Sequence, residues 1–319
     1  MISSNKHTIS DIVVTSYLGH SGDGDIFPLN LLPSYRSAVA LVRETGKTVI
    51  AKTATLYYNK GFYRPWAPWQ VVKHITKDGR VVGLINAFGL SNKGVYVCAC
   101  KIKDAIKAGF SVVPSYAPRF AQGLTAANME GVEALRIYRK VLGKDFWVWE
   151  LDASCPSSGE SIQGSEQNFI EFIKHIRFFF DGCIIVKLSP VHSVEFALKL
   201  ETIGVNVIHA MNTFPHYFLY PDLSFKSALA KYGGGGYSGE FVFEQAFAIN
   251  KALREALHIP MIMGCGISNL SHVRRYTDML SKLSKSSLNG FENSLAVCSV
   301  LRIDLPEASK ILRHQNIFA

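Results

Sequence analysis

Short apolar runs alternate with longer segments of helical periodicity along most of the chain. The runs predict strands at residues 12–16, 48–53, 110–115, 147–151, 184–188, 205–210, 260–263 and 295–300. Apolar residues recurring every three or four positions predict helices at 35–44, 125–142, 165–180, 196–203, 240–257, 269–283 and 305–313. Eight strands alternating with helices predict an α/β fold, a (β/α)8 TIM barrel forming a single domain over residues 1–319. The alternative is an open, doubly wound sheet with an appended segment.

One connection departs from this regular alternation. After the strand at 48–53 comes a segment rich in tyrosine, phenylalanine and tryptophan, followed by two apolar runs on either side of Asp78-Gly79. Asp-Gly between apolar runs is a strong hairpin signal. Connections of this length inside a compact pattern are usually functional. We therefore expect an aromatic and hairpin insertion after the second strand.

Composition narrows the class of protein. The 319 residues are 48% hydrophobic and 18% charged, which suits a globular enzyme. No apolar stretch approaches the roughly 20 residues of a spanning helix, and the first residues lack a signal-peptide core. We expect a cytoplasmic protein with no membrane partner. The net charge of +9 allows an acidic partner, but Lys and Arg form no dense run, so we expect no nucleic acid. The six cysteines are scattered, which predicts neither a disulfide framework nor a metal site.

Polar residues at the carboxyl ends of barrel strands share one face. Those residues are Ser16, Tyr17, Lys52, Thr53, Ser115, Asp152, Cys155, Lys187, Asn212, Thr213, Gly264 to Gly266, Cys298 and Ser299. Lys187 interrupts an apolar strand, where an ammonium costs several kcal/mol unless an anion or strong acceptor meets it. A buried ion pair would satisfy it. Lys52 repeats the pattern, and two such lysines favour a bound anionic ligand.

Two further features carry candidate chemistry. Glycines at 233–236, 239, 264 and 266 leave backbone N–H groups open beside predicted helix starts, which suits a phosphate, although a flexible loop explains a glycine run equally well. Cys155, followed by Pro156, ends the strand at 147–151. A thiol there could be a nucleophile, a metal ligand or a proton donor and acceptor, and the alternative is an inert buried cysteine.

Several short motifs occur together in one order: ELDASCP at 150–156, AKTAT at 51–55, NAFGLSN at 86–92, VKLSP at 186–190, AMNT at 210–213 and GGYSG at 235–239. Together they resemble motifs of the dihydroorotate dehydrogenases, FMN-dependent (β/α)8 barrels of pyrimidine biosynthesis. The first is similar to that family's E-L-N-x-S-C-P-N, in which the cysteine of the soluble class is the catalytic base.

The resemblance implies roles for individual residues. Cys155 would be the catalytic base. The substrate would contact Lys52, Asn86, Phe88, Gly89, Leu90, Asp152, Ser157, Asn212 and Thr213. FMN would contact Ser16, Tyr17, Lys52, Thr53, Asn86, Asp152, Lys187, Met211, Gly235, Gly236, Cys265, Gly266, Cys298 and Ser299. The chain shows no helical extension for a membrane quinone, so the family implies a soluble, fumarate-like electron acceptor. The family also implies a homodimer.

The chain departs from the family pattern at residues that bear on the substrate. Asp152 and Ser157 stand where the family has two asparagines, and Cys265 and Cys298 stand where glycines are usual. An ionised carboxylate only accepts hydrogen bonds, whereas an amide also donates. The expected substrate is therefore dihydroorotate or a related small cyclic anion. Two alternatives remain: a tRNA flavoprotein similar to the dihydrouridine synthases, and a catalytically altered FMN-binding barrel.

Overall fold

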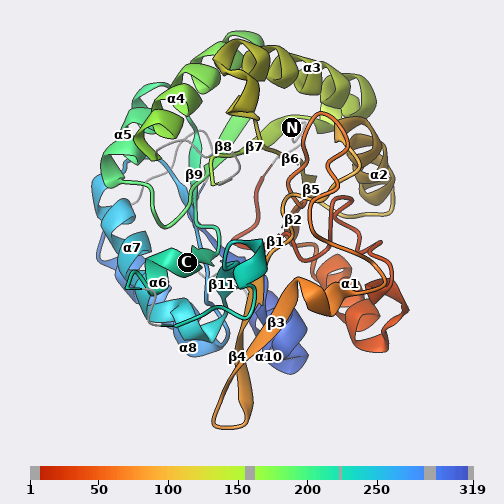
Figure 1. Ribbon diagram of the computed structural model, residues 1–319, viewed down its shortest axis with the longest axis vertical. Coiled ribbons are helices and arrows are strands. Elements are labelled where there is room, and N and C mark those ends of the chain that lie inside the picture. Colours follow the sequence, from red (N-terminus) through yellow and green to blue (C-terminus); the bar gives the residue numbers. More distant parts are fainter. Residues whose placement is uncertain (1–7, 155–161, 223–224, 284–291, 315–319) are drawn as a thin grey trace, which may run out of the picture.

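The computed structural model describes residues 8–154, 162–222, 225–283 and 292–314, with only the backbone at 162–164. Parallel strands form a ring surrounded by helices (Figure 1). In sheet order the strands are β5 (Val112–Val113), β2 (Thr48–Ile50), β1 (Ile12–Thr15), β13 (Ser294–Val297), β12 (Met261–Met263), β9 (Val207–Ala210), β8 (Cys183–Lys187), β7 (Val148–Asp152) and β6 (Ser115–Tyr116). The predicted barrel is confirmed.

The third predicted strand is divided in two. Pro114 has no N–H to donate and separates β5 from β6. β5 pairs with β2, and β6 pairs with β7, so the two pieces together fill one place in the ring. Hydrogen bonds on both sides of Pro114 continue the pairing, since Ala51 N–H donates to the Val113 carbonyl and Glu150 N–H to the Pro114 carbonyl. The sheet is thus an eight-stranded barrel with one interrupted strand.

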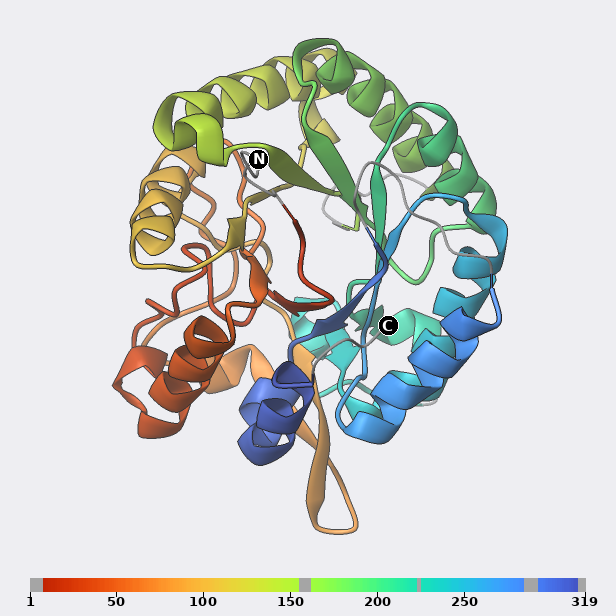
Figure 2. The same cartoon turned by 180° about the vertical axis from the view of Figure 1, so that it is seen from behind.

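The helices of the outer layer follow the strands in turn (Figure 2). They are α1 (Pro33–Thr45), α2 (Val95–Lys107), α3 (Leu124–Leu142), α4 (Ile162–Phe179), α5 (Val194–Thr202), α7 (Phe243–Ala256), α8 (Leu270–Ser281) and α10 (Leu305–Leu312). The sequence pattern missed α2, whose buried face carries mainly small residues. The last predicted strand was too long: β13 ends at Val297, and Val300 begins a short helix, α9 (Val300–Ile303).

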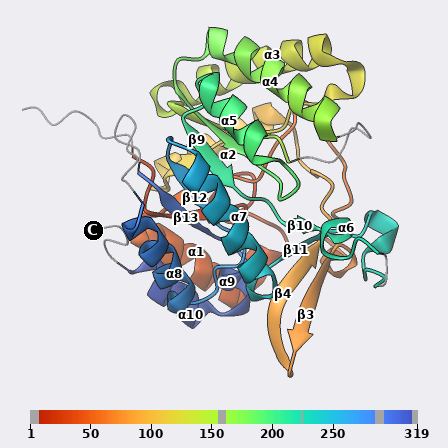
Figure 3. The same cartoon turned by 90° about the vertical axis from the view of Figure 1, so that its left-hand side faces the viewer.

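The predicted hairpin is present as β3 (Val72–Lys77) and β4 (Arg80–Asn86), which project from one end of the barrel (Figure 3). Asp78 and Gly79 both have positive φ, as a two-residue hairpin turn requires. β4 also pairs with β11 (Gly236–Ser238), which pairs with β10 (Phe214–Pro215). The glycine-rich segment does precede a helix, as predicted, since Gly239 is the N-cap of the turn Glu240–Val242 that leads into α7; the sequence did not predict that Gly236 to Ser238 form a strand of this small sheet.

The barrel interior is built in layers along the strands. One buried apolar layer takes a residue from each strand: Val13, Ile50, Val113, Val148, Ile185, Val207, Ile262 and Ala296. Side chains of a strand point to the same face every second residue. The next inward position of each strand is therefore Thr15, Lys52, Ser115, Glu150, Lys187, His209, Gly264 and Cys298. A dry layer thus supports a polar layer at the carboxyl ends of the strands.

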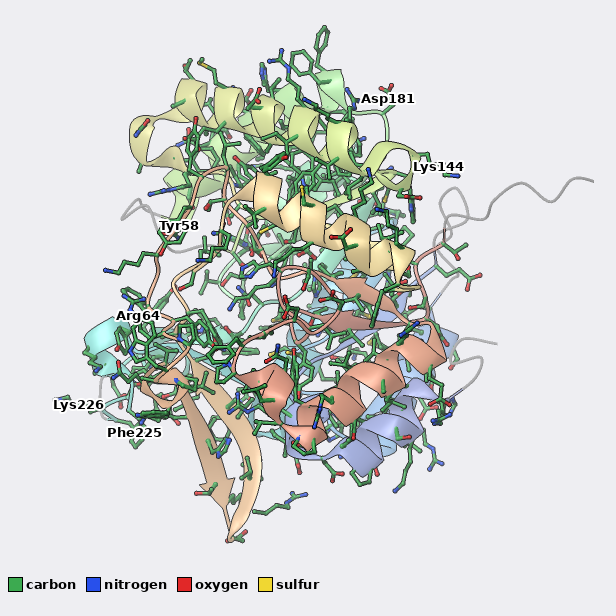
Figure 4. All side chains as sticks on the ribbon, turned by 90° about the vertical axis from the view of Figure 1, so that its right-hand side faces the viewer. Tyr58, Arg64, Lys144, Asp181, Phe225 and Lys226 are labelled. Carbon is green, nitrogen blue, oxygen red and sulfur yellow. The ribbon has the colours of Figure 1, made fainter. Side chains whose placement is uncertain are left out.

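The two ends of the barrel differ in their loops. Tyr58, Arg64 and Phe225, in loops that follow strands, lie at one end in Figure 4. Lys144 and Asp181, in loops that precede strands, lie at the opposite end. The aromatic insertion and the small sheet consequently stand at the end that carries the polar layer. No helix among the described residues is long and apolar enough to cross a membrane.

Candidate active site

Two lysines stand at the carboxyl ends of the barrel strands, as the sequence predicted. Lys187 is the last residue of β8 and is 6% exposed, and Lys52 follows β2. Within the described part of the chain, neither ammonium has a hydrogen-bond or ion-pair partner. Buried ammonium groups need such a partner. The site therefore suits an anionic ligand.

Electrostatics support the same conclusion for Lys52. The pKa of Lys52 is lowered to about 7, mainly by burial; Cys298 acts in the opposite direction, and the nearby charge of Lys187 contributes to the lowering. Its Nζ also lies over the ring of Phe88. An anion bound between the two lysines would restore the charged form of Lys52, because an opposite charge favours ionisation.

Two thiols lie beside these lysines. Burial raises the pKa of Cys298 to about 11 and that of Cys265 to about 12, against the effect of Lys187. Both groups are therefore neutral thiols near pH 7 and poor nucleophiles. Cys265 has a φ of 66°, a conformation that favours glycine, and Gly266 follows with a φ of 101°. This backbone turns sharply at the end of β12, where the sequence predicted a phosphate site.

Asp152 ends β7 and is 4% exposed. Its Oδ2 accepts a hydrogen bond from the Thr53 hydroxyl at 2.8 Å, and its Oδ1 accepts from the Ser154 N–H at 2.9 Å and from the Ser154 hydroxyl. The Asn212 amide in turn donates to Ser154 Oγ at 2.7 Å. The sequence thus correctly grouped Asp152, Thr53 and Asn212. Protein donors occupy both oxygens of Asp152, which leaves Oδ2 one lone pair for a ligand.

The small antiparallel sheet brings a second group of predicted residues together. The Asn86 amide donates to the Gly236 carbonyl at 3.3 Å, and Gly236 and Asn86 are opposite each other in the β4–β11 register. A Cβ on Gly236 would lie 2.0 Å from Thr213 Oγ1, so only glycine allows this approach. Gly89 and Leu90 follow β4 with positive φ. This sheet therefore sets the position of residues 86–90, for which the resemblance implies contact with a substrate.

The remaining predicted cofactor residues border the same end. Ser16 follows β1 with a φ of 59°, and the Tyr17 hydroxyl donates to the Leu301 carbonyl at 3.3 Å, which links the first strand to α9. Ser299 is buried immediately before α9, and Met211 is buried after β9. Gly235 lies beside Asn86, where a Cβ would be 2.9 Å from the Asn86 carbonyl. Cys155 and Ser157 lie outside the described residues.

Three residues outside the predicted set also lie at this site. Glu150 and His209 are each 1% exposed in the polar layer, and His209 Nδ1 lies 2.6 Å from Glu150 Oε2. His20 lies near Lys52, and burial together with the charges of Lys52 and Lys101 lowers its pKa to about 3. Its Nε2 is buried and has no hydrogen-bond partner among the described residues. The signal for Glu150 and His209 was available: each interrupts an apolar strand, as Lys187 does.

The fold and this cluster together define a (β/α)8 barrel whose strands carry, at their carboxyl ends, a site suited to an anionic ligand. Enzymes with this fold have their active sites at that end. Residues 39–273, more than half of the chain, match the dihydroorotate dehydrogenase family, and the chain belongs to that family. It is 25% identical over 193 residues to the catalytic subunit of dihydroorotate dehydrogenase B (NAD(+)) of Porphyromonas gingivalis (strain ATCC BAA-308 / W83). That match covers 59% of this chain and 59% of the relative. The family membership expected from the motifs is confirmed.

Proposed function

We propose that this protein is an FMN-dependent oxidoreductase that oxidises dihydroorotate or a related small cyclic anion. The main support for this proposal is that Lys52 and Lys187 lie close together and have no anionic partner among the described residues. The chain that carries them belongs to the dihydroorotate dehydrogenase family. A carboxylate-bearing substrate beside an electron-rich cofactor would supply the negative charge that these ammonium groups need.

The residues present fit FMN. His20 offers a buried ring nitrogen that has no hydrogen-bond partner in the part of the chain that the structure describes, and Lys187 offers an ammonium at the end of β8. At Gly266 a Cβ would lie 2.7 Å from Phe243 Cα, so only glycine allows the loop after β12 to pack this closely against the start of α7. Lys187 would hold the ring edge of FMN, and the backbone of Cys265, Gly266, Cys298 and Ser299 would hold its phosphate. FMN, when bound, would accept a hydride equivalent from the substrate.

The chain's own groups would carry the rest of the reaction. Cys155 would take a proton from a ring carbon of the substrate, as a general base does. Lys52, with Asn86 and the backbone of Phe88 to Leu90, would bind the substrate carboxylate and so fix the ring relative to the base.

The electron acceptor and the assembly are also proposals. The name of the Porphyromonas gingivalis relative includes NAD(+) and describes a catalytic subunit, and both concern that protein. For this chain we propose a soluble acceptor of the fumarate type and a homodimer. The acceptor is tested by measuring turnover with fumarate and with NAD+ side by side. The homodimer is tested by measuring the mass in solution by light scattering.

The decisive experiment is anaerobic spectroscopy of the purified protein. We expect a yellow protein with the absorbance bands of bound flavin, and we expect dihydroorotate to bleach those bands. The matched control is dihydrouracil, which lacks the carboxylate and should bleach them much more slowly. A protein that takes up no flavin from excess FMN contradicts the proposal. A protein that binds flavin and tRNA, but whose flavin is not reduced by dihydroorotate, would favour the dihydrouridine-synthase alternative.

A further inference from the structure

A continuous row of buried side chains crosses the polar layer of the barrel. His209 Nδ1 lies 2.6 Å from Glu150 Oε2, and Glu150 Oε1 lies 2.7 Å from the Ser115 hydroxyl. Ser115 Oγ lies 3.0 Å from the Thr53 hydroxyl, which lies 2.8 Å from Asp152 Oδ2. All five side chains are at most 4% exposed. Two carboxyl groups are therefore joined through two hydroxyl groups.

The hydrogens available for this row can be counted. Three contacts join Glu150 to Ser115, Ser115 to Thr53, and Thr53 to Asp152, and each needs one hydrogen. The two hydroxyl groups supply only two, because each carries a single hydrogen. The hydroxyl of Ser154 makes no difference, since it is directed to Oδ1 of Asp152. If both carboxyl groups were ionised, one of these three buried contacts would have no hydrogen. The lone pairs of its two oxygen atoms would then face each other.

We propose that Glu150 and Asp152 share one proton, which Ser115 and Thr53 can pass between them. In one arrangement Glu150 is protonated and donates to Ser115, Ser115 to Thr53, and Thr53 to the Asp152 carboxylate. In the other, all three hydrogen bonds are reversed and Asp152 holds the proton. Passing from the first to the second breaks three O–H bonds and forms three. One negative charge moves from Asp152 to Glu150.

The surroundings fit a pair that carries a single negative charge. Both carboxyl groups are on the inward face of β7, two residues apart, so two charges there would repel in a dry environment. His209 on β9 faces Glu150, and Lys187 on β8 lies opposite Asp152 in the strand register. His192, before α5, also lies near Asp152, but burial lowers its pKa to about 4, so it is neutral near pH 7. Lys187 therefore makes the Asp152 end the cationic side of the row, which favours the carboxylate on Asp152.

The shared proton gives the site a movable charge, and this step rests on the proposed function. Reduction of a bound flavin would place negative charge near Lys187 and Lys52. The carboxylate on Asp152 would then be the less favourable arrangement, and the proton would pass from Glu150 to Asp152. The negative charge would retreat toward His209, deeper in the barrel. Glu150, Ser115 and Thr53 would thus act as positioning residues that adjust the field at the site.

Infrared spectroscopy of the full chain tests the shared proton without a ligand. We expect the wild type near pH 7 to show the C=O band of a protonated carboxyl group, and labelling Glu side chains with 13C should shift it. Glu150→Gln should remove the band, and so should Asp152→Asn, because each amide supplies an N–H hydrogen to the row. The matched control is Glu130→Gln: burial raises the pKa of Glu130, yet it lies outside the row.

The outcomes are distinct. A band that persists in both Glu150→Gln and Asp152→Asn, or that disappears in Glu130→Gln, would overturn the proposal. So would a wild-type spectrum with no band that shifts with either 13C-Glu or 13C-Asp labels. If one amide variant fails to fold, the labelled wild type and the other variant still decide the question, since the label identifies the residue type that carries the proton.

A second measurement tests the movement of charge. In protein that retains FMN, the difference spectrum between the oxidised and reduced forms should show the band moving from the Glu label to the Asp label. A band that stays with the Glu label means that the proton does not follow the charge. If the protein holds no FMN, the proposed function fails while the ligand-free spectra still establish or overturn the shared proton.

Discussion

Lys52 Nζ lies 3.2 Å from the centroid of the Phe88 ring. Lys52 belongs to the end of the second barrel strand, whereas Phe88 follows the inserted hairpin. The contact joins the barrel to the insertion at the point where the proposed substrate carboxylate would bind. A cation over an aromatic face contributes about 0.5–2 kcal/mol, depending on how far it is desolvated.

Replacing this ring should weaken the binding of an anionic substrate. In Phe88→Leu the ammonium loses its aromatic neighbour, so we expect the Kd for dihydroorotate to rise by the equivalent of about 0.5–2 kcal/mol. The substrate-free protein should keep its stability within about 1.5 kcal/mol. Isothermal titration calorimetry measures the change. Tyr57→Leu, at an exposed aromatic of the same insertion, is the matched control, and an equal loss there would contradict the role of Phe88.

The charge state of Lys52 predicts a pH dependence of binding. With a pKa of about 7 in the free protein, Lys52 loses its proton as the pH rises from 6 to 8. An anion binds the protonated form, so affinity should fall above pH 7, by up to about tenfold per pH unit. Lys52→Met should bind weakly with a flatter profile. A wild-type affinity that is constant between pH 6 and 9 would rule out Lys52 as the recognition cation.

The same group predicts how stability depends on pH in the absence of ligand. The pKa of Lys52 falls from 10.5 to about 7 on folding, so between these values the unfolded chain binds more protons. The free energy of unfolding attributable to Lys52 should therefore rise with pH in that window, by at most about 1.4 kcal/mol per unit. Relative to the wild type, Lys52→Met should be more stabilised at pH 6 than at pH 9. Urea unfolding at both values checks the sign.

Cys155→Ala tests the proposed base. Flavin should remain bound, whereas the rate of flavin reduction by substrate should fall about 10²–10⁴-fold, the usual loss when a general base is removed. Stopped-flow absorbance measures that rate directly. Cys183→Ala, at a buried thiol of β8, is the control for loss of a cysteine. Unchanged reduction in Cys155→Ala would make this residue a structural thiol.

Gly266→Ala tests the proposed phosphate site. Its φ of 101° is strained for any side chain, and a Cβ would lie 2.7 Å from Phe243 Cα, so both stability and FMN affinity should fall. Gly109→Ala has a similar φ of 93° but nothing within 4 Å of its Cβ, and it should cost only about 1–2 kcal/mol. Flavin fluorescence titration compares the two. Equal FMN affinity in both variants would place the phosphate elsewhere.

The sequence by itself determined the barrel, most of its helices and the inserted hairpin. Apolar periodicity identifies strands and helices because each must bury one side, and Asp78-Gly79 fixes the hairpin because both residues tolerate positive φ. It also predicted the two lysines at the strand ends, since a charge inside an apolar strand needs a partner. The motif order identified the family, whose match over residues 39–273 confirms it.

Only the tertiary structure decided which distant polar groups meet. The pairing of β4 with β11, which brings Asn86 to Gly236, joins segments far apart in the chain, and no local pattern encodes such a contact. The row from His209 through Glu150 and Ser115 likewise depends on the register of separate strands. Each residue is visible in the sequence as a polar interruption. Folding alone sets the distances between these polar groups. Those distances decide whether two of them neutralise each other's charge, share a proton, or leave a cation free to bind a ligand.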